Sequence, residues 1–140
     1  RIAKVEAGGI EALADSIIAR WFSTDFRAKP EVALWRSMLV RQSGAGYQGC
    51  CAAIRDINFY TTTSGLRLPV LGIAGSEDSA TPPELVRETM ALIPGSDFQL
   101  MRHTGHLPCV EQPRDYAKHL TDFMLKTGHI NPNKMETVAR

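Results

Sequence analysis

Apolar residues recur at helical spacing through residues 1–60 of the chain. Between Gly8 and Phe22 they follow the spacing i, i+3, i+4, i+7, i+8, which predicts an amphipathic helix. Pro30 predicts the start of a second helix, because the first turn of a helix needs no N–H from its opening residue. Gly44 and Gly46 predict the end of that helix, and a third helix follows. The residues expected on the buried sides are Ile10, Leu13, Ala14, Ile17, Ile18, Trp21 and Phe22, then Leu34, Trp35, Met38 and Leu39, then Tyr47, Cys50, Cys51, Ile54 and Ile57.

The pattern changes after the polar residues 61–65. A compact apolar run at residues 68–74 predicts a buried parallel strand, and Pro82-Pro83 opens a helix that continues to about Ile93. Residues 96–101 predict a second strand. The last helix is expected to begin near Pro113, to stop at Gly128 and to bury one side. That side consists of Tyr116, Ala117, Leu120, Phe123 and Met124.

Strand, loop and helix follow one another twice in residues 61–128, which is the repeating unit of an α/β fold. Two parallel strands alone have unpaired edges and enclose too small a core for independent stability. The helices of residues 1–60 can cover a sheet, but they supply no further strand. We therefore expect the chain to be the back portion of a larger α/β domain.

Composition and charge exclude several classes of protein. The chain has 140 residues with 16 Lys+Arg against 15 Asp+Glu, and this balance argues against binding to nucleic acid or to an anionic membrane surface. It contains no signal-peptide pattern and no apolar run of the ~18–20 residues that a membrane span requires. The three cysteines, Cys50, Cys51 and Cys109, lack metal-ligand spacing, so we expect free thiols, a cytoplasmic protein and no metal site.

The candidate chemistry lies in the two loops that follow the predicted strands. Loop 75–82 carries Asp78, and loop 103–108 carries His106. Neighbouring parallel strands place such loops side by side, so the carboxylate can reach the imidazole, fix its tautomer and stabilise its charged form. Simpler interpretations stay open: Asp78 as a turn or capping acid, and His106 as an ordinary loop histidine. Glu77 is expected to cap a helix or face water, and His103 to be a surface or supporting residue.

A nucleophile for this pair is missing from the sequence. The Gly-x-Ser-x-Gly motif of a nucleophile elbow does not occur in the 140 residues. Ser76 and Ser79 lack the strained strand-to-helix turn that exposes a nucleophilic hydroxyl, and Cys50 and Cys51 fall on an apolar helix side that favours inert packing. The chain therefore holds at most two members of a Ser–His–Asp triad.

The order acid loop, helix, strand, histidine loop and C-terminal helix resembles the end of the α/β-hydrolase fold, in which Ser, Asp and His follow in that chain order. More narrowly, the chain resembles the C-terminal half of the 3-oxoadipate enol-lactonases of the β-ketoadipate pathway of aromatic degradation. The similarity covers about residues 1–128. Its most discriminating segments are Ala-Arg-Trp-Phe and Gly-Cys-Cys-Ala-Ala-Ile in the helical part. The segments that carry it are 12–15, 19–22, 49–56, 68–71, 75–82 and 105–113.

This resemblance implies a role for each matching residue. Asp78 would be the triad acid, His106 the base, and residues 1–60 a helical cap over the site. Arg20 and Trp21 would face substrate from the cap, with the Arg20 guanidinium suited to a carboxylate. Arg20 at the polar margin of a helix and Trp21 as a core residue are the alternatives. Residues 61–128 would be the C-terminal part of the hydrolase core, and residues 129–140 a tail or linker.

The resemblance also implies an activity for the complete protein, namely hydrolysis of 3-oxoadipate enol-lactone to 3-oxoadipate without a cofactor. The expected partners are a small anionic lactone and the missing N-terminal half, or a complementary chain, that carries the serine. The isolated chain is expected to be inactive. Alternatives are another α/β-hydrolase (an ester hydrolase, a haloperoxidase-like enzyme or a C–C hydrolase), or an inactive truncated fragment that associates with a partner chain.

Overall fold

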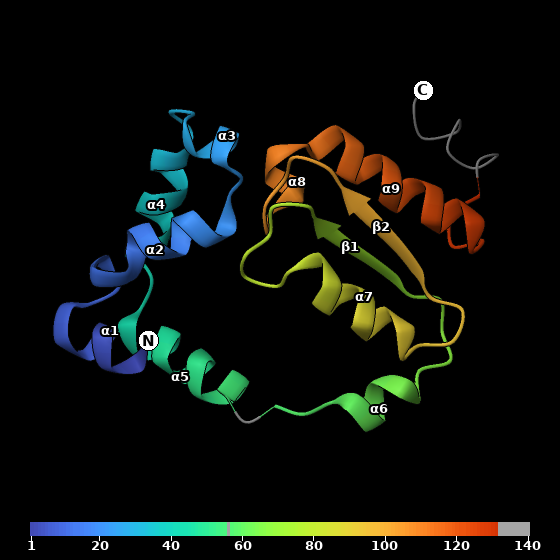
Figure 1. Ribbon diagram of the computed structural model, residues 1–140, viewed down its shortest axis with the longest axis horizontal. Coiled ribbons are helices and arrows are strands. Elements are labelled where there is room, and N and C mark those ends of the chain that lie inside the picture. The colour runs from blue at the N-terminus through green and yellow to red at the C-terminus, as the bar shows by residue number, and fades with distance from the viewer. Residues whose placement is uncertain (56, 132–140) are drawn as a thin grey trace.

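The computed structural model describes residues 1–55 and 57–131, and its elements form a helical part and an α/β part (Figure 1). The helical part contains α1 (Ile2–Gly8), α2 (Glu11–Trp21), α3 (Thr24–Arg27), α4 (Val32–Val40) and α5 (Gly44–Arg55). The α/β part contains α6 (Tyr60–Ser64), β1 (Leu71–Gly75), α7 (Pro83–Ala91), β2 (Asp97–Met101), α8 (Pro108–Glu111) and α9 (Pro113–Lys126).

Helix α2 is at the centre of the helical part. Its apolar side contacts α1 and α4 and forms a buried cluster with them, as predicted for most of the first helical stripe. Helix α1 ends before α2 because Gly9 has a φ of 66°, a left-handed conformation that glycine adopts readily. Helix α2 then begins at Glu11. The buried members of the cluster are Val5, Ile10, Leu13, Ala14, Ile17 and Leu39.

A second apolar cluster joins the two parts of the molecule. Ile18, Phe22 and Phe26 are buried together, and the rings of Phe22 and Phe26 stack with their centroids 4.9 Å apart. Leu107 and Val110, from the α/β part, pack against this cluster. The turn from α2 to α3 is therefore the place where the helical part is attached to the loop that follows β2.

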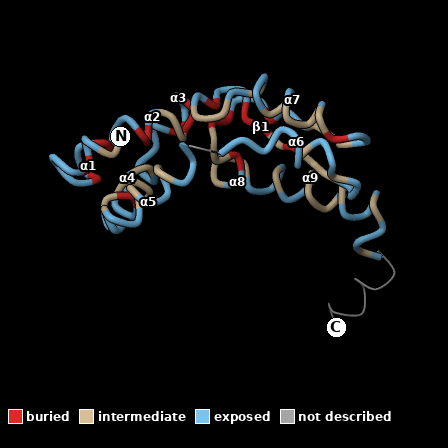
Figure 2. The backbone as a smooth tube through the Cα atoms, turned by 90° about the horizontal axis from the view of Figure 1, so that it is seen from below, coloured by how far each residue is buried: buried red, intermediate tan, exposed pale blue. Residues whose placement is uncertain are grey.

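Strands β1 and β2 form a parallel pair in which Leu71 is opposite Asp97 and Gly75 is opposite Met101. Helices α7 and α9 lie on opposite faces of this pair (Figure 2), and Gly72, Ala74 and Gly75 of β1 are buried. The structure thus has the predicted fold class: two parallel strands with helices, preceded by a helical segment. The first strand begins at Leu71 rather than at Leu68. Leu68 precedes the strand and is exposed.

Three short helices and several exposed apolar side chains differ from the predictions. Helices α3, α6 and α8 were not predicted, and Gly44 and Gly46 are within α5 rather than ending a helix. Leu34 is 71% exposed and Met38 40%, because α4 contacts α2 only along the side that carries Leu39. The predicted buried residues Ile54, Ile57 and Met124 are also exposed.

Helix α9 ends as predicted, with Gly128 at a φ of 71° just after it. The amides of His129 and Ile130 donate back to the carbonyl of Met124 at 2.9 and 3.3 Å. Most of the expected tail or linker, residues 132–140, lies outside the described residues. Within the described part of the chain, every helix is too short or too polar to span a membrane.

Candidate active site

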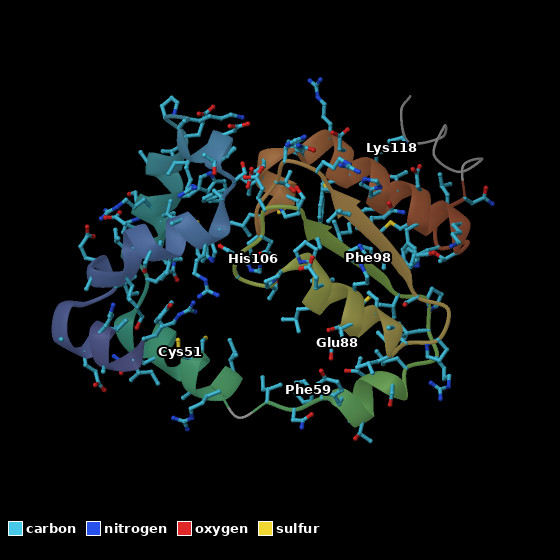
Figure 3. The ribbon with its side chains drawn as sticks, viewed as in Figure 1. Cys51, Phe59, Glu88, Phe98, His106 and Lys118 are labelled. Carbon is cyan, nitrogen blue, oxygen red and sulfur yellow. The ribbon has the colours of Figure 1, made fainter. Side chains whose placement is uncertain are left out.

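The acid and the imidazole meet where the two strands end. Asp78 lies in the loop after β1 and His106 in the loop after β2, and the Oδ2 atom of Asp78 is 2.9 Å from Nδ1 of His106. Figure 3 shows His106 between the helical part and α7. The predicted contact between the two loops is therefore confirmed.

The carboxylate of Asp78 is held from both sides. Its Oδ1 accepts the backbone N–H of Ala80 at 2.7 Å and that of Thr81 at 3.0 Å, while Oδ2 also accepts the Thr81 hydroxyl at 2.8 Å. Burial, with only 7% of the residue exposed, tends to raise the pKa of Asp78, but the hydrogen bonds from His106, Thr81 and Ala80 outweigh it and lower the pKa below its ordinary value. The Asp78 carboxylate thus stabilises the turn at residues 78–81 through these hydrogen bonds, and it remains an anion beside the imidazole.

The ring of His106 has one nitrogen engaged. Its Nδ1 is within hydrogen-bonding distance of Asp78 and, at 3.1 Å, of the Thr81 hydroxyl oxygen. Because an ionised carboxylate only accepts hydrogen bonds, Nδ1 carries the proton of the neutral ring, which leaves the lone pair on Nε2. That arrangement gives the imidazole the tautomer of a general base.

Close backbone packing sets the position of the histidine loop. The amides of His106 and Leu107 donate to the carbonyl of Trp21 at 2.8 and 3.3 Å. A Cβ atom at Gly105 would lie 2.6 Å from that carbonyl oxygen. Glycine is therefore required here by the close approach of the two backbones. The left-handed residue of this loop is His103, with a φ of 58°.

Glu111 ties this loop to the helical part. Its Oε1 accepts the amide of Gly105 at 2.8 Å and that of Ser23 at 3.0 Å, and its Oε2 accepts the Ser23 hydroxyl. Ser23 is only 2% exposed and also caps α3 by accepting the amide of Phe26. Sequence reasoning assigned no role to Glu111; a serine before a short helix signals a cap, but nothing indicates a carboxylate 88 residues away.

Thr81 is a second residue that sequence reasoning missed. A threonine three positions after an aspartate in a turn is a signal for this kind of hydrogen bonding. The other loop residues have structural contacts. Glu77 accepts the amide of Thr24, so it caps α3, and the amide of His103 donates to the Ser76 hydroxyl.

A pocket of about 290 Å³ lies between the helical part and the two loops. His106, Arg20 and Trp21 all line it, so the structure brings three of the four predicted site residues to one cavity, with Asp78 behind His106. Trp21 also packs against both apolar clusters, so it is a core residue and a pocket residue at once. The remaining lining residues are Arg1, Ile17, Tyr47, Cys50, Cys51, Ile54, Ala80 and Thr81.

Arg20 already has protein partners. Its Nε and Nη2 atoms each donate at 3.3 Å, to the carbonyls of Ser79 and Ala80 respectively. Two of the five N–H donors of a guanidinium are used in this way, and the side chain still lines the pocket. The Arg20 side chain can therefore hold the loop at residues 79–80 and still donate hydrogen bonds to a carboxylate in the pocket.

The cysteines are free thiols, and Cys50 and Cys51 line the pocket instead of packing inertly against other helices. No group of three or more His, Cys, Asp or Glu residues within the described ranges is arranged to hold a metal ion. Among the same residues, no serine or cysteine is hydrogen-bonded to His106.

Comparisons with known proteins match this architecture, although no family model matches the chain. It is 27% identical over 124 residues to 3-oxoadipate enol-lactonase 2 of Acinetobacter baylyi, covering 87% of the chain and 46% of that protein. The match to 3-oxoadipate enol-lactonase 1 of the same species is 27% over 126 residues, covering 89% and 47%. The chain thus spans about half the length of the curated relatives it matches, at their C-terminal end.

Solved structures give the same result. The enol-lactonase from Burkholderia xenovorans superimposes with a TM-score of 0.83 at 28% identity, covering 89% of this chain and 48% of that one. A thermophilic esterase from Thermogutta terrifontis gives a TM-score of 0.82 at 25% identity, covering 90% and 47%. The chain therefore has the fold of the C-terminal part of an α/β-hydrolase, and its sequence is similar to the C-terminal half of the 3-oxoadipate enol-lactonases.

Proposed function

We propose that this chain supplies the acid and the base of a serine hydrolase that cleaves a carboxylic ester bond in a lactone. The observation that carries the proposal is the contact between Asp78 and His106 at the edge of a pocket, with Nδ1 of the imidazole engaged by the carboxylate. The nucleophilic serine would come from an N-terminal half or a complementary chain, because the sequence contains no Gly-x-Ser-x-Gly motif.

The proposed reaction has two steps. Nε2 of His106 accepts the serine proton as the hydroxyl attacks the lactone carbonyl, and then returns it to the ring oxygen as the ring opens. A water molecule, deprotonated by the same nitrogen, then attacks the acyl carbonyl, and the proton passes to the serine oxygen as its bond to the acyl carbon breaks and the acid product leaves. Asp78 stays ionised throughout and stabilises the imidazolium. The chain's residues need no metal or organic cofactor for these proton transfers.

The substrate that we propose is the enol-lactone of 3-oxoadipate, an anion. Support comes from the names of the relatives and from Arg20, whose guanidinium lines the pocket and has N–H donors left for a carboxylate. The apolar wall formed by Ile17, Trp21 and Ile54 suits a small ring. We place the protein in the cytoplasm, where its three free cysteines remain reduced.

The test is hydrolysis of the enol-lactone by the complete protein. The variant His106→Ala should lose most of the activity, whereas a change at an exposed residue such as Glu84→Ala should leave it intact. The 140-residue chain alone should be inactive. Turnover by the isolated chain at a rate comparable to that of a complete lactonase would show that the nucleophile is not missing.

A second candidate is hydrolysis of uncharged esters, which the similarity to the Thermogutta esterase favours. The fold is the same, and the pocket residues decide between the two substrates. Activity of the complete protein on an uncharged ester, together with no activity on the enol-lactone, would support this candidate over the first.

The proposed partner segment pairs with the sheet. Both strands have a single neighbour in the described structure, and Leu68, which precedes β1, and Leu100, which lies within β2, are exposed. We therefore propose that the isolated chain associates through this edge. Light scattering should show association, and a monomer with cooperative unfolding would count against it.

A further inference from the structure

The C-terminal end of α2 contacts both loops of the candidate site. The side chain of Arg20 donates to the carbonyls of Ser79 and Ala80, both at 3.3 Å. The carbonyl of the next residue, Trp21, accepts the amide of His106 at 2.8 Å. Two consecutive residues of one helix therefore hold the acid loop and the base loop, the first through its side chain and the second through its backbone.

The two peptide groups that Arg20 holds are the ones that orient Asp78. In the first, the carbonyl of Ser79 accepts from Arg20 and the amide of Ala80 donates to Oδ1 of Asp78 at 2.7 Å; in the second, the carbonyl of Ala80 accepts from Arg20. The amide of Thr81 adds a second bond to Oδ1 of Asp78 at 3.0 Å. Fixing the backbone at residues 79–80 therefore fixes the donors that aim the carboxylate at His106.

We infer that Arg20 is a positioning residue for the Asp78–His106 pair, in addition to any contact with substrate. This inference rests on the proposed function, since the position of the pair affects a reaction only if the two residues act as acid and base. Displacement of the acid loop lengthens a hydrogen bond of 2.9 Å that fixes the tautomer of the base. The effect of losing Arg20 on kcat should therefore not depend on the charge of the substrate.

A role limited to binding the substrate carboxylate predicts a different result. It raises KM for an anionic substrate and leaves an uncharged ester unaffected, because the pair itself does not move. The two roles are separated by the use of one charged and one uncharged substrate of similar size.

The experiment compares Arg20→Ala and Arg20→Lys with the original sequence in the complete protein. Lysine keeps the charge but cannot supply two donors in the planar fork that reaches two adjacent carbonyls. Arg27→Ala is the matched control, because the guanidinium of Arg27 donates to Ser23 and Thr24 within its own turn. The measurements are kcat and KM on both substrates, and hydrogen exchange of the Ala80 and Thr81 amides.

Both Arg20 variants should lower kcat by about tenfold or more on either substrate and speed exchange at the two amides by a similar factor, while the control changes neither. Unchanged exchange, with a higher KM for the charged substrate alone, would overturn the inference. If the protein cleaves neither substrate, the proposed function fails, and the exchange rates still decide whether Arg20 holds the loop.

Discussion

Replacing Glu111 with alanine is the most direct test of how the helical part is fastened to the candidate site. The carboxylate accepts the amides of Gly105 and Ser23 and the Ser23 hydroxyl. Alanine removes all three acceptor contacts at once. The amide and hydroxyl of Ser23, a residue that is 2% exposed, then lose that partner where water has little access.

The size of the effect follows from those three bonds. A hydrogen bond to a charged group contributes about 1.5–3 kcal/mol to stability. Glu111 remains partly exposed, so the low end of that range applies, and three bonds give a loss of about 4 kcal/mol. Glu111→Gln keeps the length of the side chain and one acceptor oxygen, so we expect a loss of about half as much.

The assay is urea unfolding of the purified protein, followed by circular dichroism, with Glu84→Ala as the control. Glu84 is exposed in the first turn of α7, and its variant should change the free energy of unfolding by less than about 0.5 kcal/mol. A Glu111→Ala variant as stable as this control would refute the argument that the carboxylate joins the two parts.

Three further predictions concern the acid, the loop contact and the core. The pKa of Asp78 is lower in the folded state than in the unfolded chain, so the residue stabilises the fold above about pH 4 and loses this contribution as the pH falls through its folded value; urea midpoints measured from pH 6 to pH 2 should fall less steeply for Asp78→Asn. Gly75→Ala should destabilise the protein by at least about 3 kcal/mol in the same assay, because the new Cβ would lie 2.0 Å from the carbonyl oxygen of Gly105. Leu39→Ala, at a buried position, should cost about 2–5 kcal/mol. Leu34→Ala, at a position that is 71% exposed, should cost less than about 0.5 kcal/mol, and equal losses at the two leucines would contradict the burial of α4.

The spacing of apolar residues and the positions of proline predicted the helices and strands whose formation depends on neighbouring residues in the sequence. The apolar run before Gly75 predicted β1, and the Pro82-Pro83 pair predicted the start of α7 after an intervening loop. From that order the contact between Asp78 and His106 followed, because neighbouring parallel strands end at the same edge. The buried residues of α2 followed from their periodicity.

Contacts between distant segments could not be predicted in this way. Nothing near Glu111 shows that it reaches Ser23, and nothing near Arg20 shows that it holds the backbone of Ser79. The exposure of Leu34 and Ile54 was also missed, because periodicity identifies the apolar side of a helix but not whether a neighbour covers it. The catalytic roles of Asp78 and His106 stay predictions until an activity is measured.

The backbones of the two loops touch directly. A Cβ at Gly75 would lie 2.0 Å from the carbonyl oxygen of Gly105 and 2.4 Å from that of Thr104. Because the two backbones are packed this closely, neither loop can change its path without displacing the other, so the positions of the acid and the base are coupled.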